Sequence, residues 1–131
     1  MKRVLAAAAM LFLLSSFYAR PTLSGMWEYS GGIYNDKPEK APTEYALHRN
    51  YDANQYEAFL LEKGQKPEKY EAGDYTLTAD SCLETQTFSE QPSKTLNVAI
   101  HYQYTVRNDT LTFNGTLPNG TQVKEYWKKI K

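Results

Sequence analysis

The chain has 131 residues, and its 15 Lys and Arg residues are balanced by 15 Asp and Glu residues. This length fits a single domain, and a net charge of zero excludes the basic surface that binding to nucleic acid requires. The single cysteine, Cys82, excludes an internal disulfide, so the core alone must hold the fold together. We interpret Cys82 as a small buried apolar side chain rather than a reactive thiol, because no neighbouring His or Lys lowers its pKa.

Residues 1–19 have the pattern of a secretory signal peptide. Two basic residues precede an unbroken apolar run from Val4 to Leu14, and Ala19 is a small residue at the expected cleavage site. The run is too short to span a bilayer as a helix, so no transmembrane segment is expected once the signal is removed. Cleavage after Ala19 leaves residues 20–131 as one domain with a net charge of −2. The protein is therefore predicted to be secreted or periplasmic.

The segment after the signal peptide is rich in residues that favour β-strands. It contains ten tyrosines and two tryptophans, and short runs of Tyr, Thr and Val alternate with turn signals. The segment Tyr51–Lys63 also has apolar residues at helical spacing, so the sequence leaves open whether it is a strand or a helix. If this segment is a strand, the sequence predicts eight strands. They lie at residues 25–33, 43–49, 55–62, 72–78, 82–89, 96–107, 110–116 and 122–130.

The sixth predicted strand has the clearest pattern. From Leu96 to Val106 every second residue is Leu, Val, Ile or Tyr, and the residues between them are mostly polar. Asn108-Asp109 then predicts a two-residue hairpin turn, because both side chains tolerate positive φ. Pro118-Asn119-Gly120 predicts a second tight hairpin.

Strands joined by such short turns form an antiparallel meander. Left open, a meander exposes two strand edges, whereas closure removes them. We therefore predict an all-β fold, an up-and-down antiparallel barrel of eight strands, with an open sandwich as the alternative. The interior of an eight-stranded barrel is either filled by side chains or wide enough for one small ligand.

The order of several short motifs resembles the lipocalin-like (calycin) barrels, and most closely a group of small secreted bacterial proteins of unassigned function. The first strand opens with Gly25-Met26-Trp27-Glu28-Tyr29, and the last contains Glu125-Tyr126-Trp127-Lys128-Lys129. Between them lie Ala72-Gly73-Asp74-Tyr75-Thr76-Leu77 and Asn108-Asp109-Thr110-Leu111-Thr112-Phe113. Together these motifs span most of residues 20–131.

This resemblance implies a barrel with a cavity for a ligand, and it identifies no catalytic residue in this sequence. In the family, the Trp that follows Gly closes one end of the barrel, and a cation from the last strand packs across its ring. Gly25, Trp27 and Lys129 are the corresponding residues here, although the family usually has Arg at the last position.

The tyrosines on the predicted strands are the main candidates for ligand contact. A Tyr ring is an apolar surface with a hydroxyl that needs a partner when buried, which suits an amphipathic ligand. The alternative interpretation is that the same rings fill a narrow barrel, and the sequence is compatible with both. The candidate ligand-binding residues are Tyr102, Tyr104, Tyr29, Tyr75 and Phe113.

The polar candidates are three strand glutamates and the two histidines. If Glu28, Glu84 or Glu125 pointed into the barrel, burial would raise its pKa unless a cation paired with it, and otherwise these residues face solvent. A metal site would need both His48 and His101 together with a carboxylate, and isolated histidines are far commoner. We predict no metal, no cofactor and no catalytic residues.

The sequence supports three functions in descending order. The first is binding of a small hydrophobic or amphipathic ligand without chemistry. The second is a structural or protein-interaction module of the cell envelope whose barrel is filled. The third is an enzyme that uses a His or Glu near the mouth of the barrel. The sequence fixes neither the ligand nor the oligomeric state.

Overall fold

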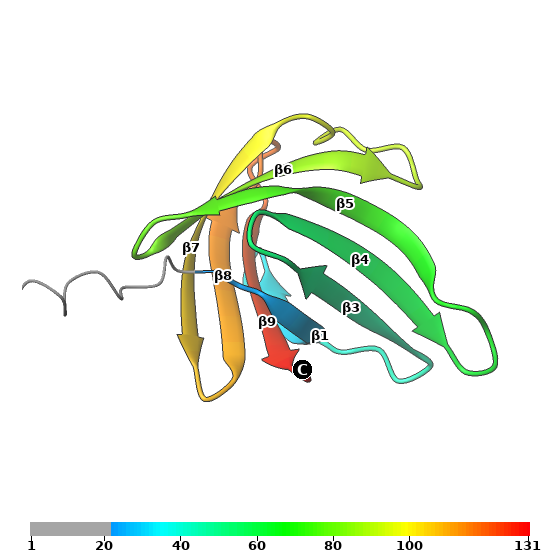
Figure 1. Ribbon diagram of the computed structural model, residues 1–131. Coiled ribbons are helices and arrows are strands. Elements are labelled where there is room, and N and C mark those ends of the chain that lie inside the picture. The colour runs from blue at the N-terminus through cyan, green and yellow to red at the C-terminus, as the bar shows by residue number, and fades with distance from the viewer. Residues whose placement is uncertain (1–21) are drawn as a thin grey trace, which may run out of the picture.

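The computed structural model describes residues 22–131, which form a closed all-β barrel (Figure 1). The predicted signal peptide lies outside the described residues. The strands in chain order are β1 (Gly25–Tyr34), β2 (Lys37–Lys40), β3 (Tyr45–Tyr51), β4 (Gln55–Glu62), β5 (Glu68–Leu77), β6 (Ser81–Ser89), β7 (Ala99–Arg107), β8 (Thr110–Thr116) and β9 (Gln122–Lys129).

The strands are antiparallel to their neighbours, and the first and last strands pair to close the barrel. The β1–β9 ladder runs from the pair Trp27–Lys129 to the pair Tyr34–Val123. Strands β2 and β3 occupy the same edge of β1, since β2 pairs with its second half and β3 with its first half. The nine strands therefore fill eight positions, and the predicted eight-stranded antiparallel barrel is confirmed.

Strand β2 is the one element that the sequence analysis did not predict. It contains Pro38, which cannot donate a backbone hydrogen bond and therefore favours an edge strand. The chain turns into it at Asn35 and Asp36, which have φ of 49° and 66°. Two consecutive residues with positive φ make the tight hairpin turn that suits twisted strands.

The structure decides the segment that the sequence left open and corrects one strand boundary. The segment with helical spacing contains strand β4, which pairs with β3 without a break. Its register with β5 shifts between Ala58 and Phe59, where Tyr70 is an extra residue on β5. The strand expected from residue 96 begins instead at Ala99. Asn97 has φ of 61°, which interrupts the extended backbone, and Leu96 and Val98 beside it are exposed.

Two other predictions are confirmed. Asn108 and Asp109 have φ of 51° and 58°, as the β7–β8 hairpin turn requires. Cys82 is fully buried, and burial raises the pKa of its thiol to about 12, with the negative charge of Glu84 adding to the effect. The thiol is therefore an apolar core group and not a nucleophile.

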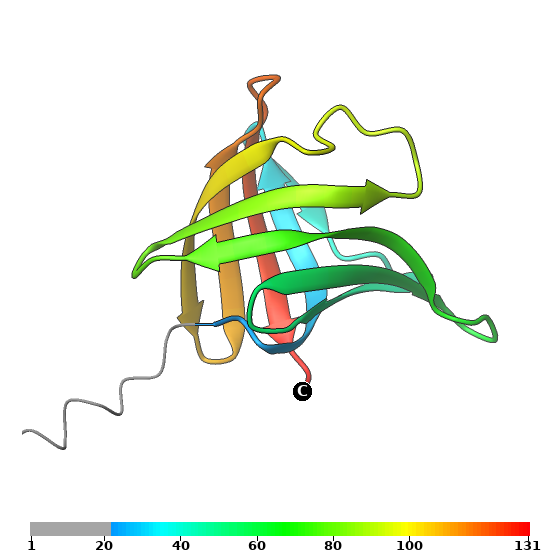
Figure 2. The same cartoon turned by 45° about the horizontal axis from the view of Figure 1, so that its top comes forward.

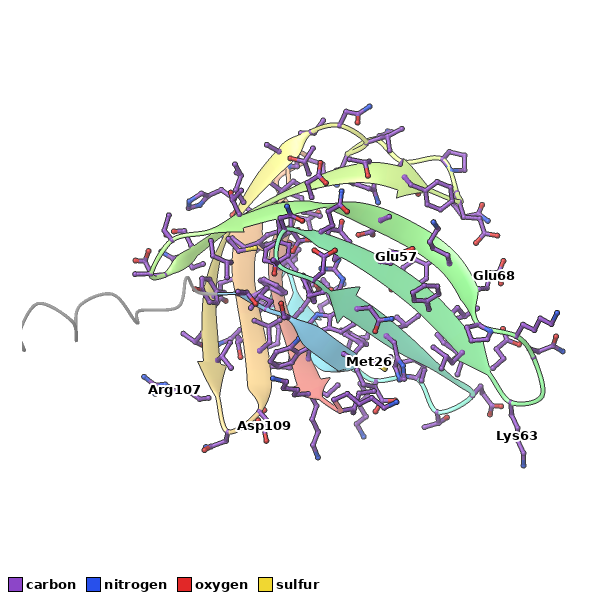
Figure 3. All side chains as sticks on the ribbon, viewed as in Figure 1. Met26, Glu57, Lys63, Glu68, Arg107 and Asp109 are labelled. Atoms are coloured by element: carbon purple, nitrogen blue, oxygen red, sulfur yellow. The ribbon has the colours of Figure 1, made fainter. Side chains whose placement is uncertain are left out.

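The two ends of the barrel differ in what surrounds them (Figure 2). We call the end that carries the start of β1, the C-terminus and the β7–β8 turn the closed end. The opposite end carries the long β6–β7 connection and the β8–β9 loop, and we call it the open end. Charged residues at hairpin tips, such as Lys63, Arg107 and Asp109, extend away from the barrel (Figure 3).

Across residues 22–131 the structure contains no helix with the length and apolar character needed to cross a membrane.

Candidate functional site

Trp27 seals the closed end, and only 2% of its surface is exposed to solvent. The Nζ of Lys129 lies 5.6 Å from the centroid of the Trp27 ring, which is cation–π geometry. Gly25 has φ of 136°, and a Cβ at this position would meet the Lys131 carbonyl oxygen at 2.6 Å. Only glycine therefore lets the end of the chain lie against the first strand.

Two tyrosine hydroxyls and an indole N–H at this end bind backbone groups. The Tyr75 hydroxyl accepts a hydrogen bond from the Leu23 amide and donates to the Asp52 carbonyl. The Trp27 indole N–H donates to the Leu23 carbonyl at 2.8 Å, and the Tyr104 hydroxyl donates to the Thr78 carbonyl at 2.9 Å. The Tyr75 bonds join the segment before β1 to the β3–β4 loop, and the Tyr104 bond joins β7 to the β5–β6 loop. The aromatic residues here form a filled structural core.

A cavity of about 250 Å³ lies in the barrel interior toward the open end. Its wall combines apolar side chains, tyrosines and four charged residues, with residues of the β6–β7 and β8–β9 loops at its rim. It is lined by Tyr34, Arg49, Tyr56, Glu71, Glu84, Gln86, Thr95, Ile100, Tyr102, Leu117, Thr121, Val123 and Glu125.

Arg49 is the centre of the polar part of this wall. Its Nη1 donates to Glu84 Oε1 at 3.0 Å and to the Tyr51 hydroxyl at 2.8 Å. Its Nη2 donates to Glu71 Oε2 at 3.2 Å, and the same oxygen accepts a hydrogen bond from the Tyr56 hydroxyl at 2.7 Å. Strand alternation explains the arrangement, because Arg49 shares its inward face with Tyr51.

Two aromatic rings hold the guanidinium in place. The Cζ of Arg49 lies 4.7 Å from the centroid of the Tyr56 ring and 5.1 Å from that of Trp127. Desolvation would lower the pKa of Arg49, but the carboxylates around it, Glu84 foremost, raise that pKa well above its ordinary value. Burial raises the pKa of Glu84, and the positive charge of Arg49 opposes this rise. Arg49 is thus a fixed cation in the barrel.

Glu125 lies apart from this cluster. Among the described residues, its one hydrogen-bond partner is the Tyr34 hydroxyl, which donates to Oε2 at 2.7 Å, and it forms no salt bridge. The Tyr29 hydroxyl lies 2.8 Å from that of Tyr34. Burial and the charge of Glu125 raise the pKa of Tyr34, which keeps its hydroxyl protonated as a donor.

The five residues predicted to bind ligand are distributed over both ends of the barrel. Tyr102 lines the cavity and packs on Phe113, with ring centroids 5.5 Å apart. Phe113 and Tyr29 are buried in the core, and Tyr75 and Tyr104 bind the backbone at the closed end. Of the five, Tyr102 alone is part of the cavity wall, and its contact with a ligand stays a prediction.

The histidines do not form a metal site. His48 Nε2 lies 3.3 Å from Glu28 Oε1, and His101 borders a hollow on the outer face of the barrel. Residues 22–131 contain no group of three His, Cys, Asp or Glu side chains arranged to hold a metal ion. Of the three glutamates considered from the sequence, Glu84 and Glu125 line the cavity, and Glu28 lies outside it.

The outer hollow is larger than the interior cavity, at about 530 Å³, and it spans β7, β8, β9 and β1. Its wall consists mostly of exposed or half-exposed polar side chains such as Gln103, Asn114 and Gln122. It lacks the buried, mutually bonded charges of the interior, and therefore we take the interior cavity as the candidate site.

The sequence analysis missed Arg49 and Glu71, the two residues that organise the cavity with Glu84. A signal for Arg49 was present, because Tyr45, Leu47 and Tyr51 stand at every second position of the strand apart from 49, and Arg49 fills that position on their face. Glu71 was missed because it lies one residue before the predicted strand 72–78, although it alternates with Gly73 and Tyr75 on the inward face of β5.

Comparison with known proteins supports the architecture. No family model matches the sequence, and no curated protein gives a significant match. A lipocalin-like protein from Bacteroides uniformis has a similar structure, with a TM-score of 0.58 over 82% of this chain and 98% of that chain. The fold is lipocalin-like. Sequence identity to that protein is 16%, so the similarity shows the fold of the lipocalin-like barrel and leaves its ligand open.

The resemblance implied a buried indole at one end and a closed barrel, and this lipocalin-like barrel has both. Trp27 is buried at the closed end, and β1 and β9 pair over most of their lengths. The lipocalin-like barrel thus has one sealed end, a filled half, and a charged cavity in the other half. Such an arrangement can hold a small molecule by burial of its apolar part and by polar contacts to its head group.

Proposed function

We propose that this protein binds a small amphipathic molecule in the cavity at the open end of the barrel, without chemical conversion. The cavity, with four charged residues in its wall, carries the proposal. Its volume of about 250 Å³ lies below the range of sites for drug-sized ligands, which favours a molecule smaller than those.

An amphipathic ligand fits the wall better than a purely apolar one. Ile100, Leu117 and Val123 offer apolar surface, whereas Glu125 has one protein donor, the Tyr34 hydroxyl, and requires a further polar partner or water. A purely apolar molecule would exclude water from this carboxylate without replacing its hydrogen bonds. A ligand with one polar end and one apolar end can contact both the polar and the apolar part of the wall.

A fluorescence titration tests the proposal, because Trp127 contacts Arg49 in the cavity wall. The purified protein is titrated with small molecules that share a six-carbon chain and differ in their head group, namely 1-hexanol, hexanoate and hexylamine. We expect a saturable change in emission that fits one site for at least one of them. The absence of saturation with all three contradicts the proposed function.

Two tryptophan substitutions locate the site. Thr121→Trp places a large ring at the rim of the cavity and should abolish the saturable change. Thr105→Trp adds the same ring at an exposed position of β7 that does not line the cavity, and it should leave binding intact. Native mass spectrometry, which avoids the added fluorescence, reads out both variants. Equal binding by both would exclude the interior cavity.

We also propose that the protein acts after export, in the periplasm or outside the cell. This rests on the charged start and apolar run of the first 19 residues. N-terminal sequencing of the protein from the extracytoplasmic fraction should begin at Arg20. An intact Met1 in the cytoplasmic fraction would contradict export.

A further inference from the structure

We propose that the cavity selects a ligand whose polar end is a protonated amine, with the carboxylate of Glu125 as its partner. This inference rests on the proposed function and names the chemical class of ligand for that same cavity. It follows from the balance of charge in the wall, from the partners of each charged group, and from the position of the apolar residues.

The described residues of the wall contain three carboxyl groups and one guanidinium, with no Lys or His among them. Arg49 already binds Glu84 and Glu71, so its charge is shared between these two partners. If Glu84 is ionised, the wall has an excess of two negative charges, and if Glu84 is protonated the excess is one. A negative excess remains in both states, and a cationic ligand would neutralise part of it.

Glu125 is the carboxylate left without a cation. Its Oε2 accepts the hydrogen bond from Tyr34, and its other oxygen has no protein donor within the described part of the chain. A neutral donor such as a tyrosine hydroxyl compensates the desolvation of a carboxylate less well than a cation does. An ammonium group beside Glu125 would supply both a positive charge and further donors.

The apolar part of the wall begins next to this carboxylate. Val123 lies two residues before Glu125 on the same face of β9, and both residues line the cavity. Ile100 and Leu117 add apolar surface from β7 and from the β8–β9 loop. A short alkyl or aromatic amine can therefore place its ammonium group at Glu125 and its apolar body against these residues.

The three six-carbon probes test this selection because they differ in head-group charge. At neutral pH, isothermal titration calorimetry on the wild-type protein should show hexylamine binding on the order of tenfold more tightly than 1-hexanol, with hexanoate weakest. The substitution Glu125→Gln keeps the shape of the side chain and a partner for Tyr34. It should reduce hexylamine affinity to that of 1-hexanol and leave 1-hexanol unchanged.

Glu28→Gln is the matched control, because Glu28 lies on a strand but does not line the cavity. This variant should keep the full preference for hexylamine. If the wild-type protein binds 1-hexanol or hexanoate as tightly as hexylamine, the amine selection is wrong while the proposed function stands. If Glu125→Gln retains the preference, Glu125 is not the partner. If no probe binds, the proposed function itself fails. The wild-type ranking tests the amine selection and the proposed function independently of how the variants fold.

Discussion

The tyrosine hydroxyls have different hydrogen-bond partners in the two halves of the barrel. At the closed end, the hydroxyls of Tyr75 and Tyr104 bind backbone carbonyls, and the rings fill the interior. At the open end, the hydroxyls of Tyr34 and Tyr56 donate to carboxylates that face a cavity. Tyrosine thus stabilises the fold in one half, and in the other half it donates hydrogen bonds to the carboxylates of a charged site.

The difference follows from which polar groups each half must satisfy. The closed end buries backbone groups of irregular segments, and a buried N–H or C=O without a partner is costly. The open end buries the charges of Arg49 and Glu84, which are tolerated only as a paired and hydrogen-bonded set. The closed half therefore has a structural role, whereas the open half has polar groups that a ligand can contact.

The largest expected effect comes from breaking the charged cluster. Arg49→Met removes the cation and leaves Glu84 and Glu71 buried without it, which should lower the free energy of unfolding by about 3–5 kcal/mol. Urea denaturation measures the loss. Arg107→Met, at an exposed hairpin tip, is the control and should cause no measurable loss. An equal effect of both substitutions would mean that the cluster does not stabilise the open half.

A smaller effect is expected at the closed end. Tyr75→Phe keeps the ring but removes the hydroxyl that joins Leu23 to Asp52, and should cost about 1–3 kcal/mol. Thermal denaturation and binding of hexylamine are measured on the same sample. Tyr126→Phe is the control, because no hydrogen bond of its hydroxyl is present within residues 22–131. Loss of ligand affinity in Tyr75→Phe, at full stability, would contradict the division into two halves.

The smallest effect is a change in how stability depends on pH. Burial raises the pKa of Glu84 above its ordinary value of 4.5, so the folded protein holds this proton more firmly than the unfolded chain does. The contribution of Glu84 to stability is therefore largest below pH 4.5 and is lost as the pH rises through the folded pKa. The other charged groups that face it, Arg49, Glu71 and Glu125, remain in the variant Glu84→Gln.

Melting temperatures of the wild-type protein and of Glu84→Gln, measured from about pH 4 to pH 8, give this contribution as a difference. The stability of the wild-type protein relative to the variant should fall as the pH rises. A difference that grows with pH would mean that Arg49 outweighs burial and lowers the pKa of Glu84.

The fold could be predicted from the sequence because its signals are local. The turn at Asn108-Asp109 and the run from Thr110 to Thr116 depend only on neighbouring residues, and β8 has those bounds. Strand β2 and the true start of β7 could not be predicted in this way. Their limits depend on pairing with β1 and on the backbone of Asn97, which are properties of the folded chain.

The closed end was also more predictable than the cavity. The resemblance to lipocalin-like barrels implied a closure by Gly25, Trp27 and Lys129, and the structure places these residues together. Arg49 and Glu71 meet because both pair with Ala58 of β4, which puts them in one row of the sheet, and this register is set only in the folded chain. The sequence suggested Tyr29, Tyr75, Tyr102 and Tyr104 as ligand surface. The cavity is instead organised by charged side chains that bind three other tyrosines, Tyr34, Tyr51 and Tyr56.

An amide NMR titration with hexylamine tests the central claim, that the open half is a binding cavity and the closed half a filled core. The account predicts saturable shifts at the amides of Gln86, Thr95, Ile100 and Thr121, with Leu23, Cys82 and Leu111 unchanged. Shifts centred on the closed end or on the outer face, or no shift at any amide, would contradict it.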